Sequence, residues 1–294
     1  MKFLLAISSS KYSGPTLKAG AMISQAFNAE LNVVYVGTKH KGLEEGPLDL
    51  SRENLAKWNI YHPGIEVLEW AFKELQQICP ENDELKSAEF NPEHIKQEHN
   101  RFKMILPTTV GCQVELTLRE GELIQELREE LRLDDYALTI IGGSQGTRNM
   151  AHDLIQYLPS SVFIARGMDL EKKYKLLLLV DDSEATKRSV RFGAEIAKTE
   201  QWEVRTLTVS KTKRFGSGYS GAAEKAKAYL EKHDIPVEQF FLTGDPVATF
   251  VDFARDDHII IMGASRATPL KKLFFGSKPI QTLKRSNTPI LVVK

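Results

Sequence analysis

The residues with the clearest spacing for chemistry lie near the end of the 294-residue sequence. An apolar run leads into Gly263-Ala264-Ser265-Arg266, and nine residues later the pair Gly276-Ser277 opens a stretch with helical periodicity. A glycine lets the backbone approach a ligand without a Cβ atom in the way. Backbone N–H groups and a hydroxyl at a helix N-terminus are a natural seat for phosphate. Three lysines add positive charge nearby: Lys271, Lys272 and Lys278. The segment therefore predicts a site for an anion.

A carboxylate stands at the end of a second apolar run. Residues 175–180 read as a strand covered on both faces of a parallel sheet, and Asp181 follows directly. A carboxylate there is suited to accept hydrogen bonds from ribose hydroxyls, or to hold a metal bound to phosphates. Taken alone, Asp181 is equally well explained as a helix cap, Gly263 as a strand-end turn and Gly276-Ser277 as a helix start. Their combination favours phosphate binding.

The elements that must position these residues alternate regularly. The expected strands are 175–180, 203–209, 237–242, 258–262 and 289–293, and the expected helices run to 199 and over 222–232, 247–255 and 277–286. Residues 215–221 are rich in Gly and Ser and read as a flexible connector. Strands alternating with helices predict an open, doubly wound, mainly parallel sheet with right-handed crossovers. Ligands bind such sheets at the carboxyl ends of the strands, where the strand order reverses.

The first part of the chain repeats this pattern. A shift of 173 positions places Gly20 on Gly193, and a shift of 120 places Gly143 on Gly263. The two shifts differ by 53, which predicts an insertion at about 39–103 between the second and third strands of the first copy. The insertion contains an amphipathic helix candidate at 64–78 and a polar stretch at 80–99.

The repeat predicts two tandem five-stranded α/β domains, 1–168 and 172–294, joined by the charged segment 169–173. The copies differ where chemistry is expected. Ser8 stands in the first copy where Asp181 stands in the second, and after Gly143-Ser144-Gln145-Gly146 the phosphate turn is shorter by about nine residues. We therefore expect only the second domain to bind a nucleotide, and the first to serve pairing and regulation.

In combination these motifs resemble the universal stress protein family, which also has a tandem two-domain form. The likeness covers nearly all of residues 174–294. It rests on the Gly263–Ser277 spacing, on the strand, Asp, x, Ser pattern of 176–183, on the turn Gly244-Asp245-Pro246 and on the last strand, 289–293.

The resemblance implies a site for ATP or another adenine nucleotide, bound alone or with Mg²⁺. Asp181 matches a residue near the adenosine, and Val209 matches the residue whose backbone meets adenine. Arg266 replaces the second glycine of the pattern, and its side chain would either displace the phosphates or donate hydrogen bonds to them. The residues expected to bind the nucleotide are Asp181, Val209, Met262, Gly263, Arg266, Gly276, Ser277 and Lys278.

The amino-acid composition limits the classes of binding partner and the cellular compartment that we expect. Lys plus Arg equals Asp plus Glu, 39 against 39, so no global field attracts nucleic acid or an anionic membrane. No window reaches the ~20 apolar residues of a membrane span. Cys79 and Cys112 form no disulfide framework or metal spacing, which favours the cytoplasm. The apolar strands 161–165 and 289–293 must be covered, by pairing between the copies or in a homodimer.

Three functions remain open at this stage. The first is a nucleotide-binding stress-response regulator with at most slow hydrolysis, because no general base is evident beside the phosphate turn. The second is a scaffold that acts through domain pairing after both nucleotide sites have decayed. The third is an adenylating enzyme, which would need a carboxylate or thiol at the α-phosphate, and none is identified. A dinucleotide-dependent enzyme is disfavoured because the glycines follow the fourth strand, not the first.

Overall fold

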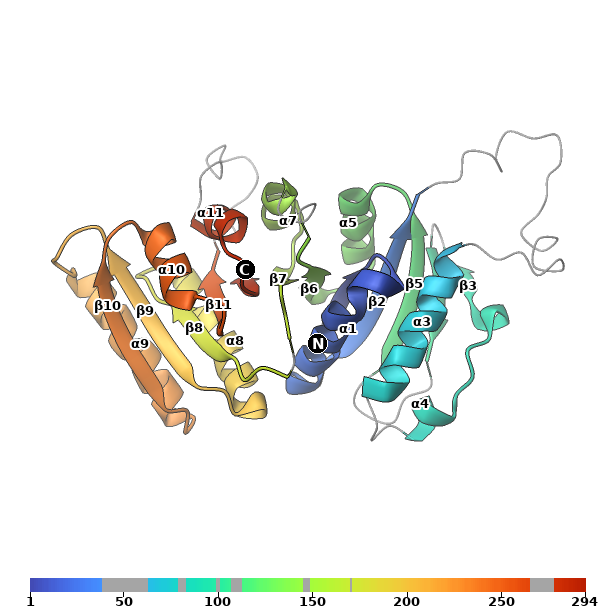
Figure 1. The fold of residues 1–294 in the computed structure, drawn as a ribbon, viewed down its shortest axis with the longest axis horizontal. Coiled ribbons are helices and arrows are strands. Elements are labelled where there is room, and N and C mark those ends of the chain that lie inside the picture. The colour runs from blue at the N-terminus through green and yellow to red at the C-terminus, as the bar shows by residue number, and fades with distance from the viewer. Residues whose placement is uncertain are drawn as a thin grey trace.

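The computed structural model describes residues 1–38, 63–78, 83–98, 101–106, 113–144, 149–169, 171–264 and 278–294 (Figure 1). We call residues 1–165 the first half and residues 175–293 the second half. The first half contains β1 (Lys2–Ile7), α1 (Ser10–Ala26), β2 (Glu30–Gly37), α3 (Pro63–Ile78), α4 (Asp83–Ser87), η1 (Pro92–His94), β3 (Lys96–Glu98), β4 (Arg101–Ile105), β5 (Val114–Glu120), α5 (Leu123–Leu133), β6 (Tyr136–Gly142), α7 (Ala151–Tyr157) and β7 (Ser161–Ala165).

In its described residues, the second half alternates strands and helices. It contains β8 (Lys175–Leu179), α8 (Glu184–Glu200), β9 (Val204–Ser210), α9 (Ser217–Lys232), β10 (Val237–Thr243), α10 (Pro246–Ala254), β11 (His258–Gly263), α11 (Lys278–Arg285) and β12 (Ile290–Val293). One expectation was wrong here: α9 begins at Ser217, inside the stretch expected to be a connector, with Gly216 at its N-cap.

The strands of both halves follow one order, and all of them join in a single sheet. The order is β10-β9-β8-β11-β12-β7-β6-β1-β2-β5-β4-β3. Within each half the first strand lies between the second and the fourth, and the neighbouring strands of the repeat pair parallel. The predicted doubly wound α/β fold is therefore confirmed. The two expected five-stranded sheets are, however, parts of one twelve-stranded sheet.

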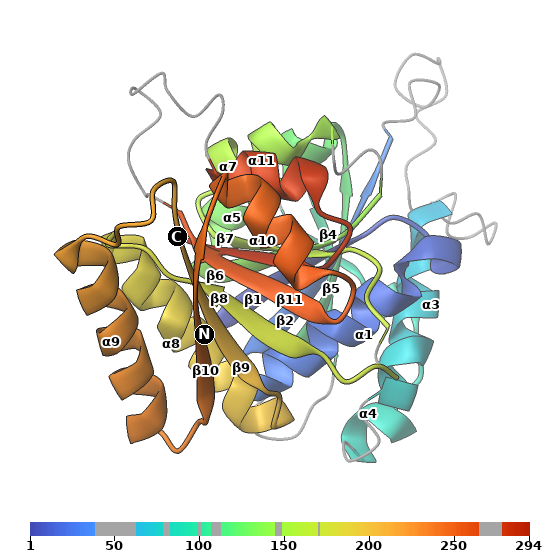
Figure 2. The same cartoon turned by 60° about the vertical axis from the view of Figure 1, so that its left-hand side comes forward.

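Helices cover both faces of this sheet, as Figures 1 and 2 show. The apolar cluster on one face joins α1 and α3 of the first half to α8 and α9 of the second. The cluster on the other face lies under α5, α7, α10 and α11. The central strands are apolar on both faces, as strands of a parallel sheet between two helical layers must be. Both cores run through the two halves without a break.

The insertion of the first half differs from the expected one. Helix α3 packs on α1, β2 and β5, just as α9 packs on α8, β9 and β10. It is therefore the crossover helix of the repeat, which two parallel strands need, and not inserted material. Among the described residues, the additional elements are α4, η1 and the antiparallel strands β3 and β4, and β4 pairs with the outer edge of β5.

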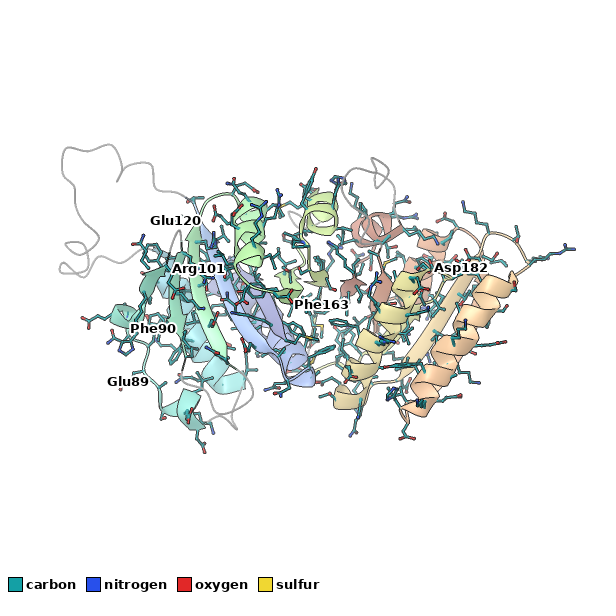
Figure 3. All side chains as sticks on the ribbon, turned by 180° about the vertical axis from the view of Figure 1, so that it is seen from behind. Glu89, Phe90, Arg101, Glu120, Phe163 and Asp182 are labelled. Carbon is teal, nitrogen blue, oxygen red and sulfur yellow. The ribbon has the colours of Figure 1, made fainter. Side chains whose placement is uncertain are left out.

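The halves meet along β7 and β12, which pair antiparallel with Phe163 opposite Leu291. Phe163 is 1% exposed and lies in the middle of the molecule (Figure 3). A basic residue follows each strand. Arg166 Nη1 donates hydrogen bonds to the carbonyl oxygens of Leu283 (2.9 Å) and Ser286 (2.6 Å), at the end of α11. The pairing between the copies thus covers the two apolar strands within one chain.

A buried network of charged residues sets the first half apart. It lies under α5, on the face of the sheet where the second half is apolar under α10. Glu130 is fully buried and pairs with Arg101 at 2.5 Å and with Arg119 at 2.9 Å. Figure 3 labels Arg101, on β4. The network joins the inserted β4 to the repeated fold.

Candidate functional site

A cavity of ≈ 1050 Å³ lies at the carboxyl ends of β8, β9 and β11. The first strand of the second half lies here between the second and the fourth, so this is the point where the strand order reverses. Five residues expected at the nucleotide site line this one cavity: Asp181, Val209, Met262, Gly263 and Lys278. They come from four different elements or their ends, and the fold brings them together.

Asp181 organises the connection between β8 and α8. Its Oδ1 accepts hydrogen bonds from the backbone N–H of Ser183 (3.1 Å), from Ser183 Oγ (2.6 Å) and from Thr186 Oγ1 (2.8 Å). Burial alone would favour the neutral acid, but these hydrogen bonds and the charge of Lys278 outweigh it and hold the pKa of Asp181 below its usual range. The carboxylate is thus ionised. It stabilises the start of α8 through these hydrogen bonds, in addition to any contact with a ligand. The next residue, Asp182, is labelled in Figure 3.

Lys278 provides positive charge on the α11 side of the cavity. It is the first residue of α11, and its Nζ lies 3.7 Å from Asp181 Oδ2. Its side chain is 45% exposed, so the ion pair is open to solvent and to exchange with another anion. Arg188 also lines the cavity, and its Nη2 donates to the carbonyl oxygen of Ala264 at 3.3 Å. This side of the cavity suits an anionic group.

The cavity also has apolar lining. Val209 is buried near the end of β9, Met262 is buried near the end of β11, and Phe250 reaches the cavity from α10. A lining that holds both charged and apolar side chains matches a ligand with one charged and one flat apolar part.

Gly263 has a role in packing as well as a place in the cavity wall. A Cβ atom built on Gly263 would lie 2.5 Å from the carbonyl carbon of Ala185 and 2.6 Å from its oxygen. The first turn of α8 therefore rests directly on this glycine, and any larger residue would push the helix away. The close helix–strand contact therefore requires a glycine at this position whether or not a ligand approaches it.

Three expected site residues lie outside the described ranges: Arg266, Gly276 and Ser277. The lysines at 271 and 272 lie outside them as well, as do residues 145–148 of the first half and both cysteines.

Sequence reasoning missed part of the cavity wall. Thr186 and Arg188 come from α8, and Lys294 follows β12. A further group comes from the first half, at the ends of α5 and α7 and the starts of β6 and β7: Leu131, Asp135, Tyr136, Ala137, Ile155, Gln156, Tyr157, Leu158, Pro159, Ser160 and Ser161. The antiparallel seam brings the amino ends of β6 and β7 beside the carboxyl ends of β8 and β11. No local pattern in these residues indicates that arrangement.

Lys294 is a buried lysine on this wall. Its Nζ donates to the carbonyl oxygen of Leu158, and its backbone N–H donates to Ser161 Oγ at 3.2 Å. Burial lowers the pKa of Lys294 from 10.5 to about 8. The folded protein therefore binds fewer protons than the unfolded chain between these two pH values.

We expect Lys294 to reduce stability below pH 8 and to cost progressively less as the pH rises to 10.5. One pKa unit corresponds to about 1.4 kcal/mol, so the full change is on the order of 3 kcal/mol. The test is the free energy of unfolding of wild type minus that of Lys294→Met, measured from pH 7 to 10.5; this difference should increase. Lys284→Met, at an exposed lysine, is the control, and a difference between wild type and Lys294→Met that stays constant over this pH range would contradict the expectation.

The corresponding edge of the first half is built differently. Ser8 takes the place of Asp181, and its backbone N–H and hydroxyl lie 3.0 and 3.4 Å from Ser13 Oγ. A Cβ atom on Gly143 would lie 2.2 Å from Cβ of Arg166, so Arg166 packs directly on the turn that corresponds to Gly263. No carboxylate stands at the end of β1.

The described part of the chain lacks the features of two other kinds of site. No group of three His, Cys, Asp or Glu side chains there is arranged to hold a metal ion. No helix within the same ranges has the length and apolar character of a membrane span.

Comparison with known proteins relates residues 174–294 to one family. Residues 174–294 match the model of the universal stress protein family. They form a universal stress protein domain. A universal stress protein of Methanocaldococcus jannaschii is 38% identical over 73 residues, which are 24% of this chain and 45% of that protein. One of Synechocystis sp. is 22% identical over 233 residues, 72% of this chain and 79% of its own length.

The likeness in fold extends beyond the universal stress protein domain. The crystal structure of a universal stress protein from Archaeoglobus fulgidus superposes with a TM-score of 0.61, over 99% of this chain and 96% of its own, at 14% identity. Both halves therefore share the fold of that protein. The cavity lies at the carboxyl edge of the universal stress protein domain and is closed on one side by the first half.

Proposed function

We propose that the second half binds an adenine nucleotide (ATP, ADP or AMP) and that the chain is a nucleotide-binding stress-response regulator. The observation that carries this proposal is the convergence of five residues of the expected site on one cavity at the switch point of the sheet. Val209 and Met262 offer an apolar seat for the base, and Lys278 offers a charged donor for phosphate. A ligand of this kind regulates by binding one arrangement of the chain more tightly than another.

The proposal is one of binding without strong catalysis. The carboxylate in the cavity that faces Lys278 is Asp181. Its Oδ1 already accepts three hydrogen bonds, and its pKa is held below the usual range. Such a carboxylate is a weak general base at neutral pH, because a base is most effective when its pKa lies near the working pH.

A nucleotide fits these residues better than a metal held by the protein alone. Within the described ranges no three ligating side chains converge, whereas Oδ2 of Asp181 faces only the ammonium of Lys278, at 3.7 Å. Mg²⁺ would therefore arrive with the phosphates of ATP, and Asp181 would supply one oxygen ligand.

Titration calorimetry of the full chain with AMP, ADP and ATP, each with and without Mg²⁺, tests the proposal. We expect Lys278→Met to weaken binding of all three by about tenfold, the loss typical of one hydrogen bond to a charged group. Lys284→Met is the matched control, because Lys284 lies on the same helix, is exposed and does not line the cavity. Equal losses in the two variants would contradict the assignment of Lys278.

One alternative function has an observation in its favour. The two halves are already joined by β7 and β12, and Lys278 already pairs with Asp181. Both features would serve a scaffold that acts through its paired halves. Failure of the wild type to bind any of the three nucleotides at millimolar concentration would contradict nucleotide regulation and favour the scaffold.

A further inference from the structure

The cavity continues well beyond the position proposed for the nucleotide. Its lining follows six consecutive strands of the sheet, from Val209 on β9 to Tyr136 on β6. Adjacent strands lie about 4.8 Å apart, so the five steps span roughly 24 Å. The residues assigned to base and phosphate occupy only β9, β8, β11 and the start of α11. The rest of the cavity crosses β12, β7 and β6, which belong to the seam and to the first half.

The far end of the cavity carries an exposed aromatic ring. Tyr157, at the end of α7, is 41% exposed. Its ring meets the ring of His152 edge-on at 5.9 Å between centroids, and the guanidinium of Arg128 lies 5.8 Å from its centre. These contacts hold the ring in place, and a held aromatic ring is a platform on which a nucleobase stacks. The surrounding lining is mixed: Leu131, Ala137, Ile155, Leu158 and Pro159 are apolar, and Asp135, Gln156, Ser160 and Ser161 are polar.

Two ammonium groups lie between the two ends. Lys278 stands at the start of α11 beside Asp181, and Lys294 follows β12 with its Nζ on the carbonyl oxygen of Leu158 in the first half. Both line the cavity. A chain of phosphates that runs from β11 across β12 to β7 would pass both cations, and each cation favours a negative charge beside it.

We propose that the cavity binds a dinucleoside polyphosphate, with one base near Val209, the phosphates along Lys278 and Lys294, and the second base on Tyr157 of the first half. The inference rests on the proposed function, since the first base and its phosphate take the site described above. It adds a second base site that the first half supplies. The ligand then touches both halves, so its binding depends on how they are joined.

The test is titration calorimetry of the full chain with AMP, ATP and diadenosine tetraphosphate. In the wild type, diadenosine tetraphosphate should bind about tenfold more tightly than ATP, because a stacked base adds that much affinity or more. Tyr157→Ala should remove this advantage and leave the affinities for AMP and ATP within twofold of wild type. Tyr12→Ala, at a tyrosine of α1 that is 70% exposed and does not line the cavity, should change none of the three.

The outcomes separate this inference from the proposed function. If AMP and ATP bind but diadenosine tetraphosphate binds no more tightly than ATP, or if its advantage survives Tyr157→Ala, the second base site is wrong and nucleotide binding stands. If none of the three binds the wild type, nucleotide binding itself is wrong. Tyr157→Leu keeps the apolar bulk without the π face, and it serves as the second variant if Tyr157→Ala lowers the thermal midpoint.

Discussion

Replacing Glu130 by alanine is expected to lower the free energy of unfolding by about 3–5 kcal/mol. Glu130 is fully buried. Its Oε1 accepts hydrogen bonds from Asn32 Nδ2 (3.0 Å), from the hydroxyl of Tyr136 (3.0 Å) and from Arg101 Nη1 (2.5 Å), and its Oε2 accepts one from Arg119 Nη1 (2.9 Å). The variant removes one carboxylate partner from each of two arginines; Arg101 keeps Glu98 and Arg119 keeps Glu126. The loss of a buried partner for a charge is strongly unfavourable.

Urea unfolding of wild type and Glu130→Ala measures this loss. The matched control is Glu129→Ala, at the preceding position of α5. Glu129 pairs with Arg132 at 2.6 Å, but its side chain is 43% exposed, so its removal should cost less than about 1 kcal/mol. Equal costs for the two variants would mean that the network does not hold the first half together.

The charged network also predicts which part of the fold fails first. Arg101 belongs to β4, so loss of Glu130 should loosen the β3–β4 pair before the rest of the sheet. Hydrogen exchange of the β4 amides in Glu130→Ala should accelerate more than exchange in β8 or β11.

Arg166→Met is expected to lower the free energy of unfolding by about 3 kcal/mol, since hydrogen bonds that involve a charged group contribute roughly 1.5–3 kcal/mol each. The guanidinium of Arg166 crosses the seam and donates to the carbonyl oxygens of Leu283 and Ser286. These carbonyl groups end α11, where the helix dipole also favours a cation. The loss of stability should be concentrated at the junction of the two halves, where β7 pairs with β12.

Denaturant unfolding followed by fluorescence and by circular dichroism checks this expectation. In Arg166→Met we expect the two probes to separate, because a weakened seam lets the halves unfold independently. Arg285→Met is the control: Arg285 lies on the same helix, is 55% exposed and approaches Asp245 only to 3.9 Å. If the control costs as much as Arg166→Met, the seam contact contributes little.

Much of the second half could be predicted from sequence because its signals are local. The run 176–180 is apolar throughout, and the helices between strands carry apolar residues at helical spacing, so strands and helices follow from the spacing of apolar residues. Once the elements are ordered, the rules for parallel sheets place Asp181, Val209 and Gly263 at one edge. The structure agrees with that placement.

Other features depend on partners far away in the chain. In β5, Glu115, Thr117 and Arg119 alternate with apolar residues, a pattern typical of a strand with one face in water. In the structure this polar face is buried, because Glu126 and Glu130 of α5 pair with Arg119. The sequence of β5 alone does not indicate that those glutamates pair with Arg119. Burial of the network could therefore not be predicted from this strand.

The alternation of strands and helices in the second half, the duplication and the edge of the sheet where a ligand is expected follow from the amino-acid sequence, because each depends on periodicity and turn chemistry within short segments. The single sheet through both halves, the packing of α8 on Gly263, and the places of Tyr157 and Lys294 in the cavity wall are visible only in the folded chain. The joined sheet and the shared wall depend on the antiparallel pairing of β7 with β12, a contact between apolar strands whose register and partner are set by the whole packed core.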